Sequence, residues 1–267
     1  MVVNMEELIH LLKLNQKDLK KELFKYLKDI DMNPISQDGF LYAEGDIPVM
    51  LVAHMDTVLD KPPEKISYSS YNDILFNQTG GLGGDDRCGI YAILYLLRKF
   101  KPYVLFTEDE EIGCVGANKA VKALLKPNVK YIIELDRRGF NDCVFYDCGN
   151  YDFIDYIESF GFKMDYGSYS DIAILGPSWD IATVNLSCGY YNEHTSDEYI
   201  IVNDLMCTIK RVKKMLKSVK RNDIPYYDYQ KDNHKYNSYD FFDLSQYDWK
   251  KILKYKKDND GGKNENK

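Results

Sequence analysis

The chain has 267 residues, of which 45% are hydrophobic and 29% are charged, as in an ordinary globular protein. Its 42 aspartates and glutamates outnumber its 35 lysines and arginines, and the net charge of −7 argues against a broad basic surface for nucleic acid. We therefore expect no nucleic-acid partner. No apolar run approaches the roughly 18 residues that a membrane span requires, so we also expect no membrane partner.

The first predicted elements are two short helices within residues 5–30, with Asn15 as the cap between them. This N-terminus lacks the basic start and the apolar block of a signal peptide. The six cysteines show no CxxC spacing, which favours buried thiols over disulfides or a structural zinc site. We therefore expect a cytoplasmic protein.

Short β runs follow Pro34, and they read GFLYAEG, VMLVAHM, KISYSS and DILFN. A glycine-rich turn, TGGLGGDD, then leads into a segment whose apolar residues have helical spacing from 90 to 97. Next come a strand (YVLFTED), a helix (ANKAVKALLK) and another strand (KYIIELD). A helix near 150–160, a strand at IATVNLS and a helix from about 205 to 219 complete the pattern.

The alternation of strands and helices predicts an α/β fold with a mostly parallel, mixed β-sheet sandwiched by helices. We expect residues 1–221 to form a single domain. Residues 222–255 are rich in tyrosine and predict a C-terminal arm that packs on this domain. The last stretch, residues 256–267, has the composition of a disordered tail.

Polar residues stand at the ends of several predicted strands. His54 and Asp56 lie two apart at the end of one strand and therefore point to the same face. A metal-bound histidine usually donates its second ring N–H to a carboxylate, which Asp56 would supply. A strand that simply reaches the surface would also explain this pair.

Further carboxylates follow the next strands. Asp85 and Asp86 stand in the glycine turn, where one of them is expected as a helix cap and two together are more typical of a cation site. The strand YVLFTED runs into four acidic residues, 108–111, whose mutual repulsion requires solvent or a cation.

Glu134 and Asp136 both end the strand KYIIELD, and period two places them on one face, so spacing alone does not choose between them. His194 follows the strand IATVNLS. The carboxyl ends of strands are where α/β sheets build their sites. The coincidence of these residues at such ends therefore predicts a functional site.

In this order the segments AHMDTV, GGDDRCG, DEEIGCVGA, ELDRRG and GYYNEHTSDEYI resemble the co-catalytic zinc exopeptidases. That clan includes bacterial leucyl aminopeptidase, peptidase T, carboxypeptidase G and the tetrahedral aminopeptidases. The resemblance covers residues 48–200 and implies a single metallopeptidase-like catalytic domain. It also implies two divalent metal ions, with zinc expected and cobalt or manganese as alternatives.

The resemblance implies a role for each site residue. His54, Asp85 and Asp136 would hold one ion, and Asp85 would bridge to a second ion held by Glu111 and His194. Glu110 would be the general base, and Asp56 would orient His54.

Only 57 residues separate Asp136 from His194, which leaves no room for the lid or dimerisation domain that many members of the clan insert there. The resemblance therefore implies a catalytic core without a lid. Ser170 and Asp171 match a Ser-Asp segment of lidless aminopeptidases and either support the site or form a structural turn.

The expected function is that of a metal-dependent exopeptidase, an aminopeptidase acting on small peptides. A carboxypeptidase or an N-acyl amino-acid deacylase would use the same site, and Arg137 and Arg138 are candidate readers of a substrate carboxylate. A two-metal phosphoesterase and a non-catalytic binding module are less favoured alternatives. The sequence does not indicate a subunit interface, so the oligomeric state stays open.

Overall fold

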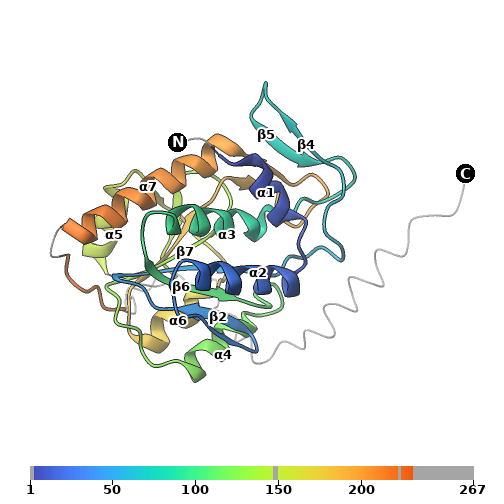
Figure 1. Ribbon diagram of the computed structural model, residues 1–267. Helices are drawn as coiled ribbons and strands as arrows, with labels where there is room; N and C mark the ends of the chain where they lie inside the picture. Colours follow the sequence, from blue (N-terminus) through green and yellow to red (C-terminus); the bar gives the residue numbers. More distant parts are fainter. Residues whose placement is uncertain (1–2, 147–149, 222–223, 231–267) are drawn as a thin grey trace, which may run out of the picture. The chain divides into compact units, whose positions relative to one another are not determined.

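Apolar residues make the central strands of the main sheet buried on both faces, whereas helices such as α1, α2 and α7 are buried on one face. The computed structural model describes residues 3–146, 150–221 and 224–230 (Figure 1). The helices are α1 (Met5–Leu12), α2 (Gln16–Asp29), α3 (Gly84–Leu97), α4 (Val115–Ala123), α5 (Tyr151–Glu158), α6 (Ile172–Trp179) and α7 (Val202–Arg221). The first six strands are β1 (Ile35–Gln37), β2 (Phe40–Ala43), β3 (Ile47–His54), β4 (Ile66–Ser69), β5 (Ile74–Asn77) and β6 (Pro102–Thr107). The others are β7 (Ile132–Arg137), β8 (Asp142–Val144), β9 (Lys163–Met164), β10 (Thr183–Ser187), β11 (Tyr190–Tyr191) and β12 (Tyr199–Ile201).

The main sheet has eight strands in the order β1-β2-β6-β3-β7-β10-β8-β9. Its centre is parallel, because β6, β3, β7 and β10 all run in one direction. The pairs β1–β2, β2–β6 and β8–β10 are antiparallel. The predicted mostly parallel mixed sheet is therefore confirmed.

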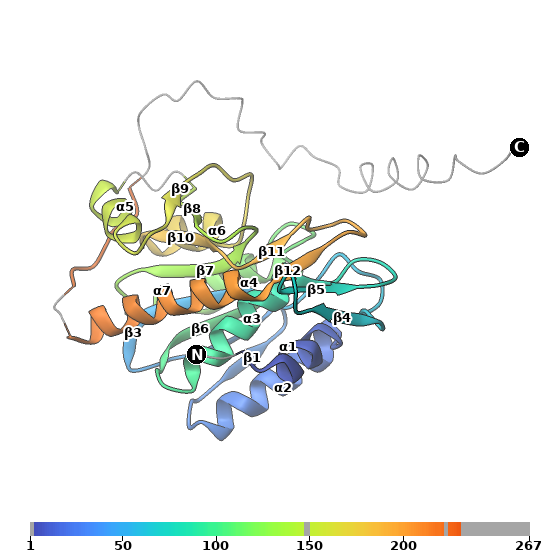
Figure 2. The same cartoon turned by 90° about the horizontal axis from the view of Figure 1, so that it is seen from above.

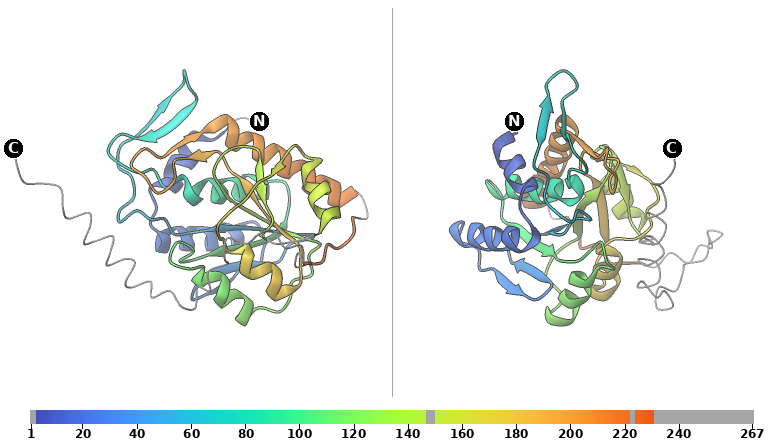
Figure 3. Two further views of the ribbon diagram at one scale, coloured as in Figure 1. Left: turned by 180° about the vertical axis from the view of Figure 1, so that it is seen from behind. Right: turned by 90° about the vertical axis from the view of Figure 1, so that its right-hand side faces the viewer.

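Helices cover both faces of this sheet, as predicted. Helices α1, α3 and α7 lie on one side and α4 and α6 on the other, which Figure 1 shows along the edge of the sheet and Figure 3 shows from behind and from the side. Figure 2 shows the long helix α7 crossing the face of the sheet that it covers.

The central strands divide their side chains between these two layers. In β3, Leu51 and Ala53 belong to the core under α3 and α7, whereas Met50 and Val52 belong to the core under α4 and α6. His54 is in step with Met50 and Val52, because side chains two apart share a face. The last residues of β3 thus turn a polar side chain toward the α4–α6 side of the sheet.

A second, antiparallel sheet of four strands has the order β11-β12-β5-β4. Its hairpin β4–β5 projects beside α1 (Figure 1). The loop between β11 and β12 carries His194, so this small sheet brings the last predicted ligand to the main sheet.

Helix α6 was not predicted as a helix, because Gly176 and Pro177 within the segment are helix-breaking residues. Among the described residues between Asp136 and His194, every element is part of one of the two sheets or of a helix covering them. No separate lid domain occurs there.

The segment 224–230 of the predicted arm packs against the domain. Tyr227 stacks on Tyr156 with ring centroids 5.7 Å apart, and its backbone N–H donates to the carbonyl of Lys130. The rest of the predicted arm and the predicted tail lie outside the described residues. Within the described part of the chain, no helix is both long enough and apolar enough to cross a membrane.

Candidate metal centre

His54 stands at the carboxyl end of β3 and is almost completely buried. Its Nδ1 lies 3.2 Å from Oδ1 of Asp56. The two oxygens of Asp56 also accept hydrogen bonds from the backbone N–H groups of Glu110, at 3.1 Å, and Glu111, at 3.0 Å. One carboxylate therefore fixes the ring of His54 and the start of the acidic loop after β6 relative to each other.

Asp85 lies between the two histidines. Its Oδ1 is 3.0 Å from Nε2 of His54, and its Oδ2 is 3.2 Å from Nε2 of His194. Each oxygen of this carboxylate thus faces a different imidazole. Burial alone would raise the pKa of Asp85, but the contacts with His194 and His54 outweigh it, so this pKa is lowered.

Glu111 and Asp136 complete the two ends of this arrangement. Oε1 of Glu111 lies 2.9 Å from Nε2 of His194, and Oδ1 of Asp136 lies 3.4 Å from Nε2 of His54. Tyr190 donates its hydroxyl to the same Oδ1 of Asp136 at 3.0 Å.

The sheet register explains why Asp136 rather than Glu134 faces His54. Val52 of β3 pairs with Glu134 of β7, so the position level with His54, two residues on, is that of Asp136. Glu134 lies two residues earlier in β7 and is fully buried, and its Oε2 accepts a hydrogen bond from Ser170 at 2.6 Å. The second oxygen of Glu134 is buried and has no hydrogen-bond partner among the described residues.

Ser170 and Asp171 lie at the start of α6, beside this group. The hydroxyl of Ser170 is shared between Glu134, at 2.6 Å, and Asp136, at 3.3 Å. Asp171 is fully buried and accepts a hydrogen bond from the hydroxyl of Thr107 at the end of β6. Ser170 therefore contacts Asp136 of the candidate site directly, and Asp171 contacts the end of the neighbouring strand β6.

The donor set suits a cation, because the group holds many more carboxylates than positive charges. Burial, together with the nearby Asp136 carboxylate, raises the pKa of Glu110 to about 9, although His54 opposes the shift. Burial and the neighbouring Asp85 raise the pKa of Asp136 to about 7. Carboxylates crowded in this way repel one another. Divalent cations placed among them would relieve that repulsion, and the nearby positive charge would lower the pKa of Glu110 toward the ionised form that can accept a proton.

The ligand atoms are also close enough to share an ion. One atom each of His54, Asp85 and Glu111 lie within 4.8 Å of one another, and the same holds for His54, Asp86 and Asp136. Asp86 fits a ligand role less well than Asp85, because its oxygens already accept from the backbone N–H groups of Gly89, at 2.9 Å, and His54, at 3.2 Å. Nitrogen and oxygen donors without thiolate match zinc, cobalt or manganese.

The glycine turn that presents Asp85 is held by a residue that sequence reasoning missed. Glu198 is buried and accepts hydrogen bonds from the backbone N–H groups of Leu82, Gly83 and Asp85, at 2.9, 2.6 and 3.1 Å. Gly83 has a left-handed φ of 78°, which glycine adopts without steric cost. No local pattern marks Glu198, since SDEY reads as a solvated loop.

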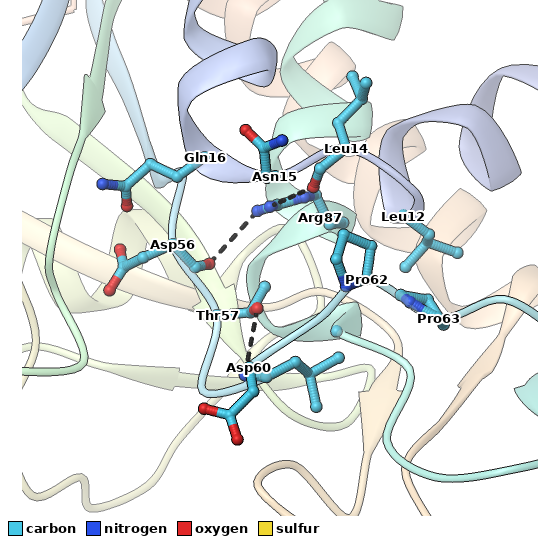
Figure 4. A pocket seen from close by; sticks show the side chains of 12 residues that line it. Leu12, Leu14, Asn15, Gln16, Asp56, Thr57, Asp60, Pro62, Pro63 and Arg87 are labelled. Carbon is cyan, nitrogen blue, oxygen red and sulfur yellow. Dashed lines mark hydrogen bonds between the residues drawn. The ribbon is translucent and has the colours of Figure 1, made fainter.

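Arg87, next to the aspartate pair, is buried, and its guanidinium donates hydrogen bonds to backbone carbonyls (Figure 4). Its guanidinium donates to the backbone carbonyls of Leu11 (3.2 Å), Leu14 (3.1 Å), Met55 (2.8 Å) and Asp56 (3.3 Å). It therefore ties the end of α1 to the loop that follows His54 and carries Asp56. The peptide bond between Asp85 and Asp86 is cis.

The structure brings all of the predicted site residues into one group. They are His54, Asp56, Asp85, Glu110, Glu111, Asp136 and His194. The other two acids of the run 108–111 turn away from it, because Glu108 pairs with Lys20 at 2.7 Å and Asp109 accepts from Gln16 at 3.2 Å.

Comparison with solved structures places the fold among peptidases, whereas no protein-family model and no curated protein sequence matches this chain. An aminopeptidase PepT from Bacillus cereus ATCC 10987 is 16% identical and superposes with a TM-score of 0.66 over 81% of this chain and 98% of its own. A tripeptidase from Staphylococcus aureus subsp. aureus Mu50 is 13% identical, with a TM-score of 0.67 over 82% and 98%. A TET aminopeptidase from the marine sediment archaeon Thaumarchaeota archaeon SCGC AB-539-E09 is 11% identical, with a TM-score of 0.65 over 81% and 98%.

Proposed function

We propose that this protein, which has the fold of the aminopeptidases and the tripeptidase above, is a metal-dependent aminopeptidase that removes the N-terminal residue of small peptides. The observation that carries the proposal is the position of Asp85, whose two oxygens each face the Nε2 atom of a different histidine. A carboxylate placed in this way is suited to bridge two cations.

In this proposal two divalent ions, with zinc as the first choice, would share Asp85 as a ligand. His54 and Asp136 would help to hold one ion, and Glu111 and His194 would help to hold the other. When bound, such ions make a water molecule more acidic and polarise the carbonyl of the scissile bond.

The residues around the ions have separate tasks. Glu110 accepts a proton from the attacking water, whose oxygen forms a bond to the scissile carbonyl carbon. As the C–N bond breaks, Glu110 gives this proton to the departing amine. Asp56 holds Nδ1 of His54, which leaves Nε2 of that ring directed at the centre, and it fixes the backbone of Glu110 at the same time.

The proposal is tested by the metal content of the purified protein and by hydrolysis of matched peptides with free and with acetylated N-termini. We expect about two zinc, cobalt or manganese ions per chain, and cleavage of the free peptides alone. Cleavage of the acetylated peptides would instead indicate a carboxypeptidase or an N-acyl amino-acid deacylase. Absence of bound metal together with absence of hydrolysis after these metals are added would overturn the proposal. The cytoplasmic location stays a prediction.

A further inference from the structure

The acidic loop that carries the proposed general base is held by a helix from the start of the chain. This loop, residues 108–111, follows β6 and contains Glu110. Lys20 of α2 donates from Nζ to Oε2 of Glu108 at 2.7 Å and to the backbone carbonyl of Gln37 at 2.6 Å. The first of these contacts joins residues 88 positions apart and acts two residues before the base.

The ion pair between Lys20 and Glu108 is largely closed to solvent. The side chain of Lys20 is 16% exposed and that of Glu108 is 15% exposed. Exposed ion pairs contribute little, whereas removal of one partner of a buried pair leaves an uncompensated charge, which is strongly unfavourable. Without Lys20, Glu108 would also repel the other acids of the loop more strongly. The position of the loop therefore depends on this lysine.

Glu108 is also fixed through its backbone. Its Oε2 accepts a second hydrogen bond, from the N–H of Gly39 at 2.8 Å, and its own N–H donates to the carbonyl of Gly39 at 2.8 Å. Its carbonyl accepts from the N–H of Gly116 in α4 at 2.9 Å. A Cβ placed on Gly116 would lie only 2.6 Å from the backbone N and O of Glu108. The turn between β1 and β2, helix α2 and helix α4 thus meet at this one residue.

The next residue carries the constraint on to the base. Asp109 has a left-handed φ of 61°, and its Oδ1 accepts from Nε2 of Gln16, also of α2, at 3.2 Å. A residue other than glycine keeps such a φ only where its surroundings hold it. The N–H of Glu110 then donates to Asp56 at 3.1 Å. The backbone of Glu110 is therefore fixed by α2 on one side and by Asp56 on the other.

A general base acts only when its carboxylate lies within hydrogen-bond reach of the proton that it accepts, and a displacement of about 1 Å can cost about 100-fold in rate. We propose that Lys20 is a positioning residue, whose ion pair with Glu108 holds the acidic loop so that Glu110 reaches the attacking water. This role rests on the proposed peptidase function. Lys20 itself takes no part in the chemical step.

The test measures hydrolysis of leucylglycylglycine by the metal-loaded protein and by its Lys20→Met variant, each at a temperature at which it is fully folded. Methionine is unbranched, favours helix and lacks the charge. We expect kcat to fall at least fivefold at equal metal content, with KM within twofold of the wild-type value. Lys20→Arg should keep at least half of the wild-type kcat, because it retains the positive charge.

Two further variants separate positioning from a general loss of charge. Lys119→Met is the matched control, because the side chain of Lys119 also lies against Gly39 but pairs with the exposed Asp38. This variant should keep the wild-type kcat. The double variant Lys20→Met with Glu108→Gln removes both charges of the buried pair, so its kcat should recover to within twofold of the wild-type value.

A kcat of Lys20→Met within twofold of the wild-type value would overturn this role and leave the peptidase function intact. Equal losses in Lys20→Met and Lys119→Met would do the same, because they would indicate a long-range effect of charge. So would a loss that follows metal content, or a double variant no more active than Lys20→Met. Absence of hydrolysis by the wild-type protein would overturn the proposed function and this role with it.

Discussion

At the scale of single residues, Asp56 and Glu198 act on the centre through other groups. Asp56 orients the ring of His54 and holds the backbone of Glu110 and Glu111. Glu198 accepts hydrogen bonds from three backbone N–H groups of the turn that leads to Asp85, those of Leu82, Gly83 and Asp85. Both carboxylates position the proposed metal ligands through hydrogen bonds, without binding an ion themselves.

The neighbours Glu110 and Glu111 should respond differently to substitution. We expect Glu110→Ala to keep its metal and to lose about 10²- to 10⁴-fold in kcat, since it removes a proton acceptor. Glu111→Ala should lose metal, because its carboxylate faces His194. Metal analysis after dialysis, alongside peptide hydrolysis, distinguishes the two. Equal metal loss in both variants would contradict the separate roles.

Substitution of Glu198 should weaken metal binding without removing a ligand. In Glu198→Ala the three N–H groups of the turn lose their acceptor, and we expect metal affinity to fall roughly 10- to 100-fold, as for other groups that orient ligands. Titration calorimetry with zinc measures the effect. The control is Asp197→Ala, which changes the exposed neighbouring residue and should bind metal like the wild type. An unchanged affinity in Glu198→Ala would show that the turn holds its shape alone.

At the scale of elements, the centre depends on where strands and helices end. Three of the parallel strands, β3, β6 and β7, bring His54, Thr107 and Asp136 to one edge of the sheet, on the side of α4 and α6. The irregular first turn of α3 supplies Asp85 from the opposite layer. The connection of α1 to α2 reaches the same place through Arg87.

The cap at Asn15 offers a test of local helix stability. Its side chain accepts a hydrogen bond from the backbone N–H of Asp18 at 2.9 Å, as the sequence predicted. We expect Asn15→Ala to lower the free energy of unfolding by about 1 kcal/mol, and Asn15→Ser to be nearly neutral because serine caps equally well. Urea denaturation measures both. Equal losses in the two variants would point to another role for this side chain.

At the scale of the whole molecule, folding gathers carboxylates from distant parts of the chain into a buried group. Asp56, Asp85, Glu111 and Asp136 come from four different segments and meet only in the folded state. Burying charges without a counter-charge is unfavourable. The proposed ions should therefore stabilise the fold as well as catalyse the reaction.

Removal of metal should lower the thermal stability of the protein. A ligand at 100 times its dissociation constant stabilises the folded state by about 2.7 kcal/mol, which corresponds to a Tm change of roughly 5–10 °C for a chain of this size. Thermal unfolding with zinc and with a chelator measures the difference. His194→Ala should reduce the shift, whereas His10→Ala, at an exposed site in α1, should preserve it. An identical Tm with and without metal would contradict a resident metal centre.

The sequence by itself determined the order of the elements and the mostly parallel sheet, because apolar spacing and turn residues are local signals. It also marked His54, Asp85, Glu111 and His194 as polar residues that follow or interrupt apolar runs. Of these four, only His54 ends a strand, whereas Asp85 lies in the first turn of α3 and Glu111 and His194 lie in loops. It could not choose between Glu134 and Asp136, since period two places both on the same face.

Only the tertiary structure showed which of the two faces His54, through the register that sets Val52 opposite Glu134 and so brings Asp136 level with His54. It likewise showed that Glu198 accepts hydrogen bonds from a turn that lies 113 or more residues earlier in the chain. Such contacts depend on strand register and on long-range packing, neither of which leaves a pattern in neighbouring residues.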